Sequence, residues 1–370
     1  MKPLKVNLVD DFELVLDGPT RRERLQIRSP YYSRLYLSQF LFSQLGLMHL
    51  LAPYLPQVVK TDFLVHPLFQ ELISAMYWSC GEITPIFETP AGFHDFGTFP
   101  KTSSKKAVIA YSGGKDSMWN LWWAQEKYGP ENVLAMHIRG LNQGQRHEAE
   151  YALRQSQEWG FNLGIIDLLN SSLNVGHAVM RSRDMFLTGL LIPLALDFGA
   201  SRIITEGRVG NSHTLFTGQA ENFRDFNRLI KKLLGIPVKV TWRYRKSMSA
   251  VKDLYLHRPY WMPLVCNCFA PIFTKPWHKS LWKERAPTFP LYESQCGSCV
   301  KCLQVNLGRL LYSSDAEKID EKDVHAFLLY IDRWIRGNRK RVWDMIQGSF
   351  LREYQRACRR YGLDPNRLLK

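Results

Sequence analysis

Short apolar runs alternate with helix-like patterns through the middle of this 370-residue chain, and this alternation limits the fold more than any other feature. The apolar runs lie at residues 107–111, 133–138, 163–167 and 202–206. Between them, apolar side chains recur at helical spacing over residues 117–127, 147–159 and 184–198. Strands that alternate with helices form a parallel sheet with helices on both faces. The sequence therefore predicts an α/β domain over residues 105–310, built on a Rossmann-like parallel sheet.

Two further regions flank this α/β domain. Residues 1–104 predict an N-terminal α+β extension of unknown role, with a strand-like start and helical patterns near residues 33–54 and 66–79. The polar stretch 98–106 is predicted to be a linker. Residues 311–370 predict a basic helical C-terminal segment, because apolar residues recur at helical spacing and arginines accumulate there.

Cysteine spacing and hydropathy indicate the compartment. Five of the seven cysteines stand in a C-x-C pair and a C-x-x-C-x-x-C run, which is typical of metal ligands in a reducing environment and not of a disulfide framework. The sequence has no run of about 18 apolar residues, and its start lacks the apolar core of a signal peptide. We therefore expect a cytoplasmic protein with no membrane partner.

A glycine pair follows the first apolar run, in the hexapeptide Ser112-Gly113-Gly114-Lys115-Asp116-Ser117. Glycines let the backbone turn tightly, and successive N–H groups at a helix start form an anion site. The two serines add hydroxyl donors and Lys115 adds a positive charge, whereas Asp116 is expected to hold Mg²⁺ or to orient the loop. The pattern is not G-x-x-x-x-G-K-[ST], so the loop of ordinary γ-phosphate hydrolases is not expected.

The hexapeptide resembles the S-G-G-x-D-S pyrophosphate loop of the N-type ATP pyrophosphatases. That resemblance implies the adenine nucleotide alpha-hydrolase type of Rossmann-like fold. It also implies cleavage of ATP to AMP and pyrophosphate, with adenylation of a carbonyl or carboxylate oxygen. We expect ATP and Mg²⁺ as cofactors on this basis.

A second segment narrows the resemblance to one family. Gly144-Gln145-Arg146-His147, with Glu150 three residues on, is similar to the G-Q-R-H-x-x-E segment of the 7-cyano-7-deazaguanine synthases. Those enzymes use ATP and ammonia to convert 7-carboxy-7-deazaguanine to the nitrile, on the route to queuosine and archaeosine. By residue type alone, Arg146 and His147 could equally cap a helix or pair with Glu150.

The resemblance also implies individual roles. Arg183-Asp184 ahead of Phe186 is similar to the family's R-N-x-x-F segment, and Gly207 matches its strand-end glycine. The catalytic residues implied are Lys115, Asp116 and Arg146. The nucleotide contacts implied are Ser112, Gly113, Gly114, Lys115, Asp116, Ser117, Gln145, His147, Arg183 and Gly207.

The C-x-x-C-x-x-C run supplies three candidate thiolates, from Cys296, Cys299 and Cys302. Zinc takes four ligands in such closed structural sites, so a fourth is needed. The family takes its fourth from a cysteine shortly before the run, where this chain has none. The segment 265–269 resembles the family's W-S-C-Y segment, which implies Cys268, with Cys266 and His278 as alternatives. An iron–sulfur cluster fits the ligand type, but the resemblance favours Zn²⁺.

Some features depart from the family. Its G-Y-P-D-C-R-P-E-F base-pocket segment corresponds to G-Q-A-E-N-F-R-D-F at residues 218–226, and the chain carries long additions at both ends. Divergent relatives occur in bacterial anti-phage gene clusters. The formal net charge of +15 favours acidic or phosphate-bearing partners. The family resemblance implies a 7-deazaguanine-type substrate with ammonia as the nucleophile, and the additions and the altered pocket segment suggest an amine on a partner protein as the alternative nucleophile. A nucleic-acid partner and a homo-oligomer are compatible with the sequence.

Two other functions are compatible with the loop. One is a tRNA-modifying amidating or thiolating enzyme of the same superfamily, favoured by the basic C-terminus because phosphate neutralisation dominates RNA binding. The other is a non-catalytic nucleotide sensor, against which the intact Asp116 and Ser117 argue.

Overall fold

The computed structural model describes residues 4–18, 22–28, 36–92, 98–140, 145–170, 182–206, 220–235, 237–243, 245–266, 289–297, 299–337 and 348–364. The chain forms two compact units, each assembled from separate segments. The first unit comprises Met1–Tyr111, Asn120–Ala149 and Phe161–Tyr244, and the second comprises Ser112–Trp119, Glu150–Gly160 and Arg245–Lys370. The ranges predicted from the sequence, 1–104, 105–310 and 311–370, stay predictions.

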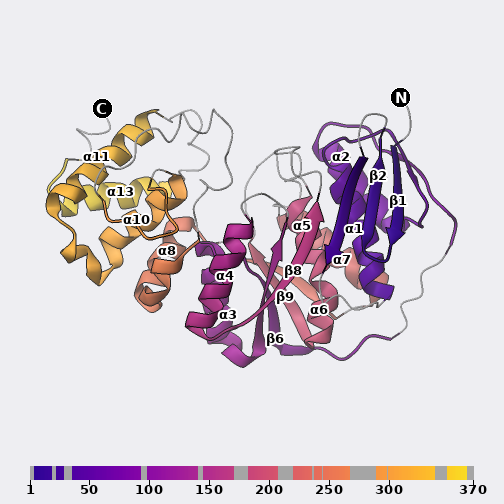
Figure 1. The fold of residues 1–370 in the computed structure, drawn as a ribbon, viewed down its shortest axis with the longest axis horizontal. Coiled ribbons are helices and arrows are strands. Elements are labelled where there is room, and N and C mark those ends of the chain that lie inside the picture. Colours follow the sequence, from indigo (N-terminus) through magenta and orange to yellow (C-terminus); the bar gives the residue numbers. More distant parts are fainter. Residues whose placement is uncertain are drawn as a thin grey trace. The chain divides into compact units, whose positions relative to one another are not determined.

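A ten-stranded sheet runs through the first unit in the order β10-β9-β6-β7-β8-β3-β2-β1-β4-β5. Figure 1 labels β1, β2, β6, β8 and β9 of this sheet. Its strands are β1 (Leu4–Asp10), β2 (Glu13–Asp17), β3 (Arg22–Arg28), β4 (Val58–Thr61), β5 (Ile86–Glu88), β6 (Ser103–Ala110), β7 (Val133–Arg139), β8 (Asn162–Asn170), β9 (Ala200–Glu206) and β10 (Lys239–Arg243). From β10 to β8, every neighbouring pair is parallel. The prediction of an α/β fold with a large, mostly parallel sheet is confirmed.

The N-terminal region continues this sheet. Strand β3 pairs antiparallel with β8, with Leu25 opposite Asn170 and Arg28 opposite Asp167. Strands β2 and β1 follow in antiparallel order, and β4 and β5 complete the row in parallel order. One apolar core includes Leu14 and Leu25 of the N-terminal strands together with Ile166 of β8.

Helix α1 (Tyr36–Leu51) joins the N-terminal strands to the helices of the parallel half. It is apolar on nearly every side and almost wholly buried, as expected of a helix that has neighbours all round. It packs on α5 (Arg183–Leu190) at Gly189, where a β-carbon would lie 2.1 Å from Leu45 Cδ1. The close approach of the two helices therefore requires glycine at position 189.

Two details differ from the sequence predictions. The sequence predicts a linker that includes residues 103–106, but strand β6 begins at Ser103. Polar side chains are tolerated there because the first four residues of β6 are exposed or half-buried. Residues 184–198 form two helices, α5 and α6 (Ile192–Asp197), and not one. Pro193 lies in the first turn of α6, and proline in a helix interior would remove a hydrogen bond.

The other helices are α2 (Pro67–Ser79), α3 (Lys115–Tyr128), α4 (Gln145–Trp159), α7 (Ala220–Leu234), α8 (Ser247–His257), α10 (Val300–Tyr312), α11 (Glu321–Gly337) and α13 (Gly348–Arg360). In the second unit, α10, α11 and α13 lie side by side (Figure 1). They share an apolar core that includes Leu307, Phe327 and Tyr354. Along the described parts of the chain, no helix combines the length and hydropathy needed to cross a membrane.

Candidate functional site

The glycine loop lies at the start of α3, in the second unit, and its residues form hydrogen bonds with one another. The Ser117 hydroxyl donates to the Gly114 carbonyl at 2.9 Å, and it accepts from the Ser112 N–H at 3.2 Å. The Ser112 hydroxyl lies 3.2 Å from that of Ser117. Gly113 has a φ of +73°, a conformation that favours glycine. The loop therefore turns tightly into α3, whose first N–H groups have no partner within a helix and can bind an anion.

Charged side chains lie at the same turn. Lys115, 2% exposed, forms an ion pair with Asp116, whose side chain is 29% exposed. A buried ammonium needs a partner of opposite charge, and Asp116 supplies one. A bound phosphate would offer Lys115 a second one. The loop therefore combines backbone donors, two hydroxyls, a cation and a carboxylate within six residues.

Other predicted site residues fall partly outside the described structure. Gln145, Arg146 and His147 begin α4, but their side chains lie outside the described residues. Gly207 lies just beyond the end of β9 and is also outside. The segment matched to the family's base pocket runs into α7 from Ala220 onward. The roles assigned to these residues stay predictions.

Arg183 begins α5 in the first unit and lies among carboxylates. Its Nε donates to Asp184 Oδ1 at 2.8 Å. Burial disfavours the charged guanidinium, but the charges of Asp184, Glu206 and Glu148 outweigh burial and raise the pKa of Arg183. Arg183 is therefore kept positively charged at the start of α5.

His49, from α1, packs against the start of α5. Its ring stacks on Phe186 with centroids 4.6 Å apart, and its Nδ1 lies 3.0 Å from the Ser182 hydroxyl. Burial, and next the positive charge of Arg183, lower the pKa of His49 to about 3. The folded protein thus holds this imidazole neutral between the N-terminal region and α5.

The neutral state of His49 predicts a loss of stability in acid. Above pH 6.5 the imidazole is neutral in both states, and as pH falls from 6.5 toward 3 only the unfolded chain takes up the proton. Relative to His49→Gln, wild-type stability should therefore fall by about 1.4 kcal/mol per pH unit in this window. Urea denaturation at pH 7, 6 and 5 measures this slope, and His257→Gln controls for losing an exposed imidazole. Parallel slopes for wild type and His49→Gln would contradict the prediction.

Three cysteine sulfurs meet in the second unit, within 4.8 Å of one another. Cys299 and Cys302 Sγ are 3.4 Å apart, and Cys296 and Cys302 Sγ are 3.9 Å apart. Sulfurs around a tetrahedral zinc with bonds of about 2.3 Å would lie about 3.8 Å apart. Gly297, with a φ of +74°, makes the turn between the first two cysteines, and Cys299 caps α10. These residues fit a metal such as zinc.

The described residues exclude one of the three candidates for the fourth metal ligand. Cys266 packs with Tyr151 and Leu264 and is not part of the sulfur cluster. Cys268 and His278 lie outside the described residues. Cys268 therefore stays the predicted fourth ligand, with His278 as the alternative.

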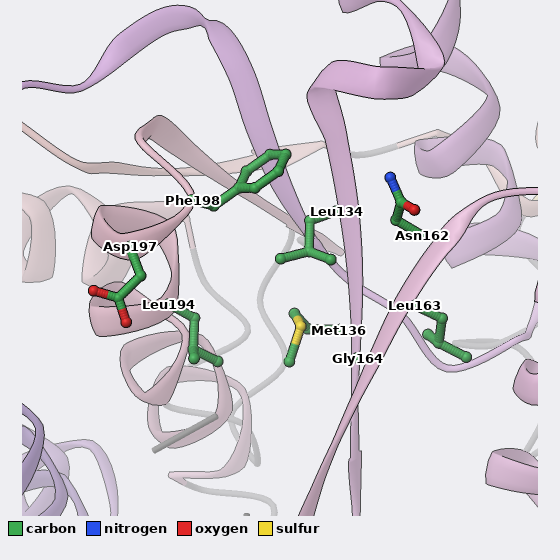
Figure 2. A pocket seen from close by; sticks show the side chains of 8 residues that line it. All are labelled: Leu134, Met136, Asn162, Leu163, Gly164, Leu194, Asp197 and Phe198. Carbon is green, nitrogen blue, oxygen red and sulfur yellow. The ribbon is translucent and has the colours of Figure 1, made fainter. Parts of the chain in front are cut away.

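A hollow of about 410 Å³ opens in the first unit, on the face of the sheet beside α6 (Figure 2). It is lined by Leu134, Met136, Asn162, Leu163, Gly164, Leu194, Asp197 and Phe198. Burial raises the pKa of Asp197. The strand residues that line it come from the amino ends of β7 and β8, whereas ligands of open α/β sheets bind at the carboxyl ends. We therefore assign no nucleotide to this hollow.

Sequence reasoning missed two buried polar residues at these sites, His49 and Gln155. Gln155 of α4 donates to the Gly113 carbonyl of the loop and is wholly buried. The only signal was a polar side chain on the face of the expected helix that also carries Ala152 and Tyr151. Such a residue belongs to no motif, because its role depends on segments distant in the sequence.

The described residues thus define a mixed α/β protein with a mostly parallel sheet, a strand–glycine loop–helix turn and a cysteine cluster. No family model matches the chain. The chain is similar to the 7-cyano-7-deazaguanine synthase of Shouchella clausii (strain KSM-K16), with 25% identity over 196 residues, 45% of this chain and 85% of that protein. This likeness supports a distant relationship.

Proposed function

We propose that the chain uses ATP to activate a carboxylate, releasing pyrophosphate and then AMP, in a Rossmann-like fold of the adenine nucleotide alpha-hydrolase type. The observation that carries the proposal is the Ser112–Ser117 loop. It turns at a positive-φ glycine into the start of α3, where backbone N–H groups can bind an anion, and it adds the positive charge of a buried lysine. The similarity to a 7-cyano-7-deazaguanine synthase makes 7-carboxy-7-deazaguanine the proposed substrate.

In the proposed reaction, a carboxylate oxygen attacks the α-phosphorus of ATP, and the bond from that phosphorus to the β-bridging oxygen breaks. An amine then attacks the carbonyl carbon, and AMP leaves with the electrons of the acyl–oxygen bond. The product is an amide, and a second activation of the amide oxygen would give a nitrile. The loop N–H groups, Lys115 and Arg146 would stabilise phosphate charge, and Asp116 would hold Mg²⁺, which would supply further positive charge.

Zinc has a structural role in this proposal. Three thiolates from Cys296, Cys299 and Cys302, with Cys268 as the fourth, form a closed site without an open position for substrate. The ion would fix the turn that begins α10.

The nucleophile is ammonia or an amine on a partner macromolecule. The N-terminal strands and C-terminal helices are additions beyond the region that resembles the synthases, and the changed base-pocket segment is consistent with a specialised role. We propose attachment of the deazaguanine to a partner protein in anti-phage defence as the specialised form of the reaction.

The test is mass spectrometry of reactions containing ATP, Mg²⁺ and 7-carboxy-7-deazaguanine, with and without ammonium. AMP together with free amide or nitrile would establish a small-molecule synthase and remove the reason to invoke a partner. AMP without a free product would point to a macromolecular acceptor. If no AMP forms with either the small-molecule amine or candidate partner proteins, the proposal is wrong.

A tRNA-modifying enzyme is the second candidate, and one surface favours it. Arg352, Arg356, Arg359 and Arg360 are all exposed and follow helical spacing on α13. Such a face can neutralise nucleic-acid phosphates. Binding of tRNA that weakens steeply between 50 and 200 mM salt, roughly as counterion release predicts, would support this candidate.

A further inference from the structure

The carbonyl of Gly113 accepts two hydrogen bonds from outside the loop, both within the second unit. The side-chain nitrogen of Gln155 donates at 3.0 Å, and the backbone N–H of Cys266 donates at 2.9 Å. The first donor lies on α4 and the second follows the short helix Pro259–Leu264. Two segments distant in the sequence therefore hold one carbonyl of the loop.

Holding that carbonyl determines where the next N–H points. The peptide unit is planar and trans, so the Gly114 N–H points opposite to the Gly113 carbonyl. On that side, the Gly114 N–H donates to the Ser112 hydroxyl at 3.4 Å. Because the unit lies between two glycines, its rotation meets little steric resistance. A rotated unit would turn the carbonyl oxygen, and not the N–H, toward a bound anion. A loop that binds phosphate through its N–H groups needs this rotation to be prevented.

Gln155 is placed to prevent it. The side chain is wholly buried, and the same nitrogen also donates to the Leu264 carbonyl at 2.7 Å. A β-carbon at Gly113 would lie 3.0 Å from Gln155 Oε1, so the amide packs directly on the loop backbone. Gln155 thus joins the loop to the segment that ends in Cys266.

The segment 264–266 is held from its other side as well. The Ser294 hydroxyl donates to the Val265 carbonyl at 2.5 Å, two residues before Cys296 of the cysteine cluster. The N–H of Cys266 and the side chains of Gln155 and Ser294 therefore tie the loop into the body of the second unit.

We propose that Gln155 is a positioning residue for the phosphate loop: it holds the Gly113–Gly114 peptide with its N–H on the side of the Ser112 hydroxyl, where the nucleotide phosphates would bind. The inference rests on the proposed function, since it assumes that the loop binds the phosphates of ATP. Gln155 itself does not contact the reacting atoms.

Calorimetric titration with inorganic pyrophosphate tests the role of Gln155. In Gln155→Met, which keeps the length of the side chain but has no amide, pyrophosphate should bind about ten- to a hundred-fold more weakly, as expected when a buried hydrogen-bond partner is lost. Gln157→Met, the same change at an exposed position of α4, should bind like wild type. Equal affinities for wild type and Gln155→Met would overturn the inference alone. A wild-type protein that binds neither ATP nor pyrophosphate would overturn the proposed function and the inference with it.

The variant Gln155→Glu should give a pH-dependent pyrophosphate affinity, which a packing defect alone would not produce. A neutral carboxylic acid can donate to one of the two carbonyls, whereas a carboxylate would repel both. Burial beside carbonyl oxygens should raise the pKa of the introduced acid. The pyrophosphate affinity of Gln155→Glu relative to wild type should therefore recover as pH falls through that pKa and decline as pH rises. A ratio that is the same at every pH from 5 to 8 would contradict the positioning role, even if Gln155→Met fails to fold.

Discussion

Replacing Asp116 with alanine is expected to lower the rate of AMP formation by a factor on the order of 100 to 1000, the loss seen when one preorganised electrostatic group is removed from an active site. The substitution removes the carboxylate that pairs with the buried Lys115. It also removes the proposed Mg²⁺ ligand from the first turn of α3. Release of AMP from ATP, followed by mass spectrometry, measures the effect.

Two further variants isolate the role of the Asp116 charge. Asp116→Asn keeps the size of the side chain and should be almost as inactive as the alanine variant, because it cannot neutralise a cation. Asp323→Ala removes an acid from the first turn of another helix, α11, and should leave the rate unchanged. Full activity in Asp116→Ala would exclude Asp116 from catalysis and weaken the assignment of the loop.

Replacing Cys302 with alanine is expected to release the metal and to unfold part of the second unit. The Cys302 sulfur is buried and lies within 4 Å of the two other cysteine sulfurs. A structural zinc contributes to folding outright. Since about 1 kcal/mol of lost stability lowers Tm by about 2–4 °C for a unit of this size, the loss of several kcal/mol expected on releasing a structural metal should lower Tm by on the order of 10 °C. Elemental analysis for zinc and a thermal melt measure the two effects.

Cys358→Ala is the matched control for Cys302→Ala. Cys358 is equally buried, but it packs in the core of α10, α11 and α13, outside the sulfur cluster. This variant should keep its zinc and lose only the small stability expected from removing one sulfur atom. A Cys302→Ala protein that retains one zinc per chain would show that the ion is held elsewhere.

The parallel half of the sheet could be predicted because its signal is local. The runs at 107–111, 133–138, 163–167 and 202–206 are short and have apolar residues at their centres. Each run lies within a strand, except that the last residue of 107–111 lies just beyond β6. The N-terminal strands carry a weaker signal, since β3 alternates polar and apolar residues. Its pairing with β8 is a contact across about 140 residues, and no pattern in either strand specifies that partner.

The candidate site was predictable to the extent that its residues are contiguous. Six consecutive residues form the loop, and the C-x-x-C-x-x-C spacing brings three sulfurs together, as predicted. His49 and Gln155 could not be predicted because each acts on a segment far away in the sequence. His49 is a lone histidine in a mostly apolar helix, and Gln155 is one of many polar residues in α4.

The antiparallel pairing of β3 with β8 has a practical consequence for shortening the chain. A fragment limited to the region that resembles the synthases would leave β8 as an edge strand with unpaired N–H and carbonyl groups, and apolar side chains shared with the N-terminal strands would become exposed. Such an edge recruits other chains and promotes aggregation. Among the described strands, this side of the sheet ends instead at β5, a strand of three residues whose Glu88 pairs with Lys60 at 2.5 Å. A short edge strand with a charged side chain, such as β5, is a poor template for pairing with another chain. The N-terminal region therefore disfavours self-association through this edge of the sheet.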